Sequence, residues 1–268
     1  HRDLHSFPTR RSSDLNGLGG LIGFAASLTA AYFLDQYSYP QDLRLLFWVG
    51  FATSFISPFF IAAYREERFP FNGKRETLGE FFRAIPGHIK TSPGFSRYMW
   101  VRALLSLGLL ANSFYALYAI QRFDLNEGVL GIITMVILLS QSAMGFLWGW
   151  LGDHVGFKLV YVLSAVLVVL MGLLAVTAVN ILPFYVIAFC IGGIYAVTRT
   201  ADSNMVFELA PPSETSRFIG ISNTFVAPVI TLAPLAGGVV AEYLSHQVLF
   251  WCVLAIGVLS VLLTTIYM

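Results

Sequence analysis

Residues 145–158 read Gly-Phe-Leu-Trp-Gly-Trp-Leu-Gly-Asp-His-Val-Gly-Phe-Lys, and this stretch joins the end of one long apolar segment to the start of the next. It contains the pattern Gly149-x3-Asp153-x2-Gly156-x-Lys158. Gly149 would let two helices approach closely, and Gly156 would permit a tight reversal between them. Lys158 is typical of the cytoplasmic loops of membrane proteins, which gather positive charge. Asp153 supplies a carboxylate suited to the positive end of a neighbouring helix.

Composition places the chain among membrane proteins. Apolar residues make up 57% and charged residues 12% of its 268 residues, whereas soluble domains are about 25% charged. An apolar run of about 18 residues or more is long enough to cross a hydrocarbon layer of about 30 Å. The sequence therefore predicts an all-α polytopic membrane protein with about eight transmembrane helices, at residues 16–35, 44–64, 100–121, 128–151, 157–179, 181–203, 217–241 and 247–267.

The position of the 145–158 stretch among the predicted helices is also informative about the fold. A long charged connection, residues 65–99, is followed by six predicted helices, and the motif lies between the second and third of them. Motif and position together resemble the signature loop of the major facilitator superfamily, Gly-x3-Asp-x2-Gly-[Arg/Lys]-x-x-x-[Arg/Lys], which joins the second and third helices of each six-helix half. The match is partial, because Phe157 replaces a basic residue and the later basic positions are reduced to Lys158.

The resemblance implies a domain organisation. Residues 16–64 would be the last two helices of an N-terminal half, residues 65–99 a cytoplasmic central loop, and residues 100–268 the six-helix C-terminal half. Four N-terminal helices would then be missing, so we expect a fragment. Residues 1–15 are polar and resemble a translated sequencing adapter, with a disordered tail as the alternative. The alternative for the whole chain is a complete eight-helix protein of another kind.

The distribution of basic residues predicts the orientation, because Lys and Arg favour cytoplasmic loops. One side carries only Arg44 and Arg122, and an even number of helices puts both chain ends on the same side. We therefore expect an integral multi-pass protein of the bacterial cytoplasmic membrane with both ends in the cytoplasm. The predicted cytoplasmic residues are Arg65, Arg68, Lys74, Arg75, Arg83, Lys90, Arg97, Arg102, Lys158, Arg199 and Arg217.

Uncharged polar residues near the middle of the predicted helices are candidates for a substrate pathway. By the resemblance, the first, second, fourth and fifth helices of each half line a central cavity, whereas the third and sixth face lipid. An alternative role for each residue is an interhelical hydrogen bond, which contributes about 0.6 kcal/mol. The candidate pathway residues are Asn112, Tyr115, Gln141, Tyr195 and Asn223.

Charged residues around the connection between the predicted helices 181–203 and 217–241 form a second candidate site. Arg199 and Asp202 are three residues apart, which places them within reach of each other on a helix. Together with Glu208 and Arg217 they predict a cytoplasmic charge cluster. No Asp, Glu, Lys or Arg falls near the middle of any predicted helix.

Other classes of function find little support. Asp153 and His154 are adjacent on a turn, so they do not face each other as an acid–base pair, and the Gly-x4-Gly-Lys-[Ser/Thr] pattern of ATP-driven proteins is absent from the sequence. Cys190 and Cys252 lie in separate predicted helices and predict neither a disulfide nor a metal site. We expect no enzyme activity, no cofactor, no metal and no nucleic-acid partner.

The resemblance implies a secondary active transporter of small solutes that works by alternating access. Its expected partners are a small-molecule substrate, the lipid bilayer and a coupling proton or ion. The alternative is a transport-inactive relative that acts as a membrane sensor or scaffold.

Overall fold

The computed structural model describes residues 41–63, 92–125, 128–211 and 214–267, together with scattered positions between 22 and 37 and between 77 and 87. The expectations for residues 1–15 lie outside the described residues, as do most of those for the predicted helix 16–35. The chain divides into a smaller unit, residues 25–84, and a larger unit that holds residues 85–268. The two units are described separately.

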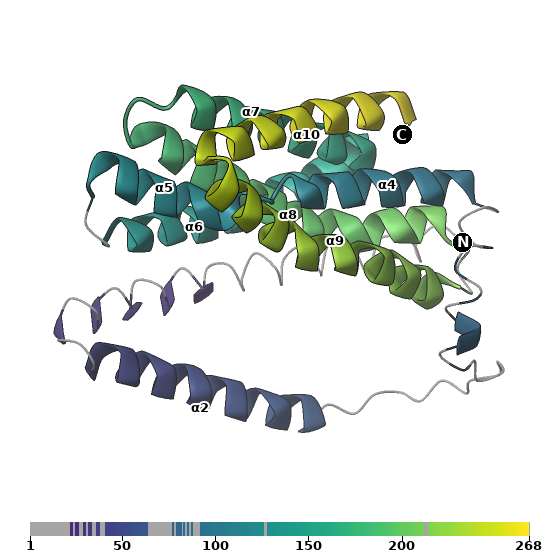
Figure 1. Ribbon diagram of the computed structural model, residues 1–268. Coiled ribbons are helices and arrows are strands. Elements are labelled where there is room, and N and C mark those ends of the chain that lie inside the picture. Colours follow the sequence, from purple (N-terminus) through teal and green to yellow (C-terminus); the bar gives the residue numbers. More distant parts are fainter. Residues whose placement is uncertain are drawn as a thin grey trace. The chain divides into compact units, whose positions relative to one another are not determined.

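The larger unit consists of six helices that are long and apolar enough to cross a membrane (Figure 1). This confirms the predicted all-α polytopic class and the six helices after the central connection. The part of the chain that the structure describes contains no strand. The first crossing is formed by α4 (Pro93–Leu107) and α5 (Asn112–Phe123), and the others are α6 (Gly128–Val155), α7 (Phe157–Thr177), α8 (Leu182–Leu209), α9 (Thr215–Tyr243) and α10 (His246–Tyr267).

The smaller unit contains α2 (Gln41–Ala63), which corresponds to the predicted helix 44–64. Its strongly apolar part, Arg44–Phe60, is shorter than any of the six crossings of the larger unit. Downstream, the Thr77 amide donates to the Glu80 carboxylate at 2.8 Å, and the Glu80 amide donates to the Thr77 hydroxyl at 3.3 Å. This reciprocal pair is a capping box, which starts a helix.

The first crossing begins at Pro93, earlier than the predicted boundary at residue 100. Proline suits the first turn of a helix because its φ is already helical and its missing N–H would have no intrahelical partner. Arg97 therefore belongs to α4, and Arg102, the third residue of the predicted helix 100–121, lies nine residues after Pro93. The same crossing is interrupted at residues 108–111, between α4 and α5. A Cβ on Gly108 would lie 2.7 Å from Val168, so glycine is needed where this break meets α7.

Glycines set the closest helix contacts in the larger unit, as expected where small residues let backbones approach in a membrane protein. Between α7 and α10, a Cβ on Gly172 would lie 2.6 Å from the Leu254 backbone, and one on Gly257 would lie 2.7 Å from the Val169 amide. Between α6 and α8, a Cβ on Gly192 would overlap the Ile137 carbonyl. These contacts pair α7 with α10 and α6 with α8 along much of their lengths (Figure 1).

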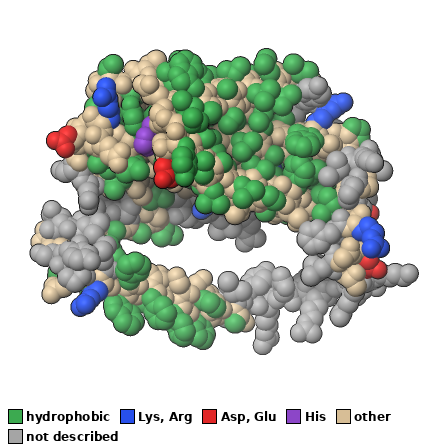
Figure 2. All heavy atoms as spheres, in the orientation of Figure 1, with side chains coloured by type: hydrophobic (Ala, Val, Ile, Leu, Met, Phe, Trp, Pro, Cys, Tyr) green, Lys and Arg blue, Asp and Glu red, His purple; other side chains and the backbone are tan. Residues whose placement is uncertain are grey.

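The outer surface of the larger unit is mostly hydrophobic on the face shown in Figure 2. Exposed large apolar side chains occur along α10, for example Trp251, Leu259 and Ile266, which are 57%, 47% and 72% exposed. A surface of this kind is stable against hydrocarbon rather than water. The larger unit is therefore a helix bundle with an apolar surface on this face, and we expect its functional polar groups in the interior.

Candidate functional site

The motif at residues 145–158 forms the turn between α6 and α7. Helix α6 ends at Val155, Gly156 has a φ of 106°, and α7 begins at Phe157. A positive φ of this size favours glycine, because other side chains are strained there. Gly149 is buried in α6, whereas Asp153 and Lys158 are exposed on this unit. Across the loop, the resemblance implies that Asp153 lies near the start of the predicted helix 16–35, and that start is outside the described residues.

Phe157 has a structural role at the position where the family has a basic residue. Its side chain is 4% exposed, and a Cβ on Gly152 would overlap its ring. The ring thus fills the space that Gly152 leaves open at the end of α6. The packing gives a local physical reason for an apolar residue at this point of the motif.

A buried ion pair joins α4 to α8. The Arg102 guanidinium lies 2.7 Å from an Asp202 carboxylate oxygen, and the two side chains are 15% and 7% exposed. The Tyr161 hydroxyl of α7 donates to the other oxygen of this carboxylate. The Tyr98 hydroxyl donates to the Asp202 backbone carbonyl at 3.1 Å.

Arg102 also binds α9. It donates to the Ser222 hydroxyl at 2.6 Å and to the Asn223 side-chain oxygen at 3.0 Å. A charge taken out of water is costly unless it is paired and hydrogen-bonded, and Arg102 meets both conditions. The network therefore holds α4, α7, α8 and α9 together through one carboxylate and one guanidinium.

The pair bears on the expected charge cluster. Asp202 is followed by seven further residues of α8, which places it about 10 Å inside the helix end at 1.5 Å per residue. It is buried against Arg102, a partner outside the expected cluster. Arg199 and Glu208 are exposed and Arg217 is half-buried, and their grouping stays a prediction.

The ion pair could have been found from the sequence by one signal. Arg102 and Asp202 each interrupt an apolar stretch, and an isolated ionisable residue within a membrane helix usually faces the interior and a partner. In the predicted helices 100–121 and 181–203 both residues lie close to a helix end, and α4 and α8 extend beyond these ends, so the signal is hidden.

A second polar contact joins α5 to α8. The Asn112 side-chain amide donates to the Tyr195 hydroxyl at 2.5 Å, and both residues are half-buried. Both are predicted pathway residues. The structure brings this pair together with the ion pair around one cavity.

The cavity lies between α4, α5, α8 and α9 and has a volume of about 400 Å³. Arg102 and Asp202 line it together with Asn112 and Tyr195, and Ser106, Ser113 and Thr198 add hydroxyl groups. An adjoining cavity of about 170 Å³ shares the ion pair and extends to Ser203, Ser222 and Asn223. Three of the five predicted pathway residues, Asn112, Tyr195 and Asn223, therefore line connected polar space.

The other two predicted pathway residues lie elsewhere. Tyr115 is 3% exposed and stacks on Phe250 with a centroid distance of 5.2 Å. It lines another, mostly apolar cavity of about 200 Å³ between α5, α6 and α8, which shares Asn112 with the first cavity. The Tyr115 hydroxyl has no hydrogen-bond partner among the described residues. Gln141 is half-buried on α6 beside Gly192 and is not among the residues that line the polar cavities. The described residues contain no group of three or more His, Cys, Asp or Glu residues that could hold a metal.

Six membrane-length helices define an integral, multi-pass membrane protein. The family model of the Major Facilitator Superfamily matches residues 110–268, which is more than half of the chain. The chain belongs to the Major Facilitator Superfamily, and the expected family is confirmed. A comparison with curated proteins finds no match to the chain.

Proposed function

We propose that this protein is a secondary active transporter that moves a small polar solute across the cytoplasmic membrane by alternating access. The family supports transport in general, since its members are transporters rather than enzymes. The observation that carries the proposal is the cavity of about 400 Å³, whose polar groups come from three different helices, α4, α5 and α8, while its α9 wall is apolar. In carriers of this kind, substrate sites lie within the membrane between structural repeats.

The chemistry of the walls favours a solute without net charge. Arg102 and Asp202 neutralise each other at 2.7 Å, so the pair leaves no unbalanced charge to bind an ion. Asn112 offers one amide that is engaged with Tyr195, and Ser106, Ser113 and Thr198 offer hydroxyl groups. These groups would exchange hydrogen bonds with a solute that carries hydroxyl, amide or similar groups.

The ion pair is also the place where a coupling proton or cation would act. An ionisable residue within the membrane is by default a functional candidate, because its burial is costly. Protonation of Asp202, or its contact with a cation, would release Arg102 and weaken the link between α4 and α8. The Asp153 turn, the start of α4 and the end of α10 would lie on the cytoplasmic side, as the charge distribution predicts.

Transport by the full-length gene product in proteoliposomes tests this function. Uptake of labelled neutral sugars and neutral amino acids would be followed under an imposed proton gradient, with Asn112→Ala and Tyr195→Phe beside the wild type. We expect accumulation of at least one solute, with a raised KM in both variants, because each loses one side of the 2.5 Å contact.

Val166→Ala is the matched control, because Val166 is 45% exposed on α7 and far in sequence from the cavity walls. Its KM should equal that of the wild type. A wild-type KM in both cavity variants would contradict the site, and failure of every solute to accumulate would contradict secondary active transport.

A further inference from the structure

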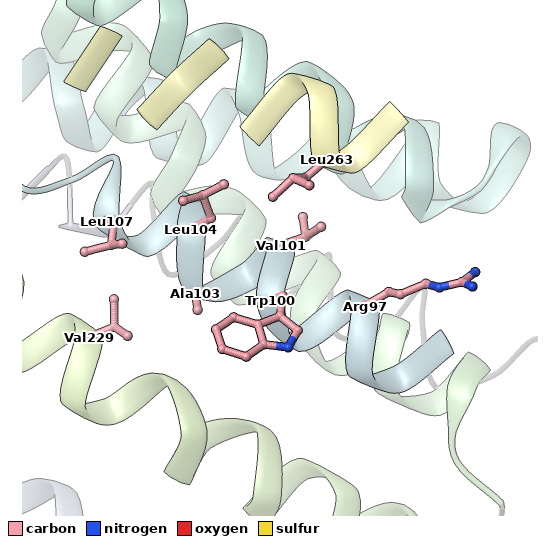
Figure 3. A pocket seen from close by; sticks show the side chains of 8 residues that line it. All are labelled: Arg97, Trp100, Val101, Ala103, Leu104, Leu107, Val229 and Leu263. Atoms are coloured by element: carbon pink, nitrogen blue, oxygen red, sulfur yellow. The ribbon is translucent and has the colours of Figure 1, made fainter. Parts of the chain in front are cut away.

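A further cavity lies along α4. It shares only α4 and α9 with the polar cavities and none of their lining residues, and its lining is almost entirely apolar. Trp100, Leu104 and Leu107 of α4 form its length, Val229 of α9 and Leu263 of α10 form its sides, and Arg97 lies at one end (Figure 3). Its volume is about 410 Å³. In Figure 3 the Arg97 side chain extends along the helix, away from the apolar residues.

The groove has the dimensions of one leaflet of a bilayer. Arg97 is close to the start of α4, and Leu107 is its last residue. The ten residues between these ends span about 15 Å at 1.5 Å per residue, which is half of the hydrocarbon thickness of about 30 Å. The groove therefore reaches from the depth of the lipid headgroups to the region of the midplane.

The two ends of the groove differ in chemistry in the same way as a phospholipid. The apolar part offers only hydrocarbon contacts, whereas a guanidinium pairs with phosphate through two parallel hydrogen bonds. Trp100 lies one turn inward from Arg97, at 61% exposure, and its ring packs edge-on against Phe225 at 5.2 Å. Tryptophan at this depth is typical of residues at the membrane interface.

We propose that this groove binds one acyl chain of an anionic phospholipid, with its phosphate group on Arg97. The charge distribution puts the start of α4 at the cytoplasmic leaflet, whose anionic lipids attract basic residues. The bound lipid would pack against α4, α9 and α10 at once and would stabilise their contact. The site is independent of the transported solute.

The binding can be measured on the purified full-length protein. Samples in detergent would be equilibrated with vesicles of phosphatidylcholine alone or of phosphatidylcholine with phosphatidylglycerol, and retained lipids would be counted by native mass spectrometry. We expect the wild type to keep one phosphatidylglycerol with a preference of about fivefold over phosphatidylcholine, because choline offsets the phosphate charge of phosphatidylcholine whereas phosphatidylglycerol has a net negative charge.

Three variants locate the site. Arg97→Gln should lose the preference for phosphatidylglycerol, and Arg97→Lys should keep part of it. Val229→Phe should lower retention of both lipids, because the ring occupies the space of the acyl chain. Arg122→Gln is the matched control, since it removes an exposed basic residue at the other end of the same crossing, and its lipid retention should not change.

A second measurement identifies any other occupant. The fluorescence of Trp100, taken as the difference between the wild type and Trp100→Phe, should be quenched by brominated phosphatidylglycerol. If Trp100 is not quenched and no lipid is retained, another protein segment or a second copy covers the groove, and the proposal is overturned. An unchanged preference for phosphatidylglycerol in Arg97→Gln would also overturn it.

Discussion

The ion pair between Arg102 and Asp202 allows the most quantitative prediction. Replacement of Asp202 by Leu leaves the guanidinium of Arg102 without its counter-charge and without access to bulk water, since its side chain is 15% exposed. Breaking one side of a buried pair costs about 3–5 kcal/mol. Arg102 keeps its hydrogen bonds to Ser222 and Asn223, so we expect a smaller loss of about 2–4 kcal/mol in the free energy of unfolding.

The partner substitution and the double variant complete the experiment. Arg102→Met should also destabilise the protein, because it leaves the Asp202 carboxylate with Tyr161 alone. The double variant Arg102→Met/Asp202→Leu removes both charges and should lose less than the sum of the single changes, with a coupling energy of about 1–3 kcal/mol. Asp153→Asn is the matched control, because this carboxylate is exposed, and its effect should stay within about 0.5 kcal/mol.

Equilibrium unfolding of the purified protein in mixed micelles, with a rising fraction of sodium dodecyl sulfate, measures these free energies. Far-ultraviolet circular dichroism would report the loss of helix. If the single changes add up in the double variant to within about 0.5 kcal/mol, the two residues do not interact. The account of a stabilising network across four helices would then be wrong.

Three further predictions concern other parts of the chain. Asp153→Asn should lower the transport rate of the full-length protein while membrane insertion remains normal, since a carboxylate at the N-terminus of a neighbouring helix, the expected partner, contributes only about 0.3–1 kcal/mol. A wild-type rate would contradict a role of Asp153 in conformational change. Hydrogen bonds from the Thr77 amide and hydroxyl lower the pKa of Glu80. The ionised carboxylate therefore stabilises the helix start that it caps at pH values above the ordinary glutamate pKa. This stabilisation is lost as the pH falls through the lowered pKa. Hydrogen exchange at the Phe81 amide, corrected for its intrinsic pH dependence, should therefore report weaker protection in acid. Glu80→Gln, which cannot titrate, should remove this change, and the same change in Glu80→Gln would contradict the assignment. In the same unfolding assay, Gly257→Val should destabilise the protein by about 1–3 kcal/mol or more, because the new side chain meets the α7 backbone. Gly145→Ala is the control and should be nearly neutral, because a Cβ at this position meets open space.

The sequence predicts the architecture well because hydrophobic length is a strong signal in membrane proteins. Six apolar runs after residue 99 become six membrane-length helices, and the turn at Gly156 falls where the motif predicts it. Boundaries are less certain, because polar residues in the first turns of a helix look like a loop. The start of α4 at Pro93 is the clearest case, and it places Arg97 in a helix rather than a loop.

The candidate site is predicted only in part, because the direction of a side chain depends on helix rotation. Asn112, Tyr195 and Asn223 do line the polar cavities, whereas Tyr115 turns to Phe250 and Gln141 lies beside Gly192. The sequence signal, a polar residue at mid-depth, is the same for all five. The pairing of Arg102 with Asp202 spans 100 residues of chain, and it emerges only when α4 and α8 are packed together.

The most direct test of a carrier function is whether the cavity opens to water on each side of the membrane in turn. Thr198 lines both polar cavities, so Thr198→Cys would be made in a background with Cys190 and Cys252 replaced by alanine. Its labelling by a membrane-impermeant maleimide would be measured in right-side-out and inside-out vesicles, with Leu173→Cys of α7 as the control on an exposed apolar face. The account predicts labelling of Thr198→Cys from both sides and no labelling of Leu173→Cys. Labelling of Thr198→Cys from one side only, or from neither, would contradict alternating access through this cavity.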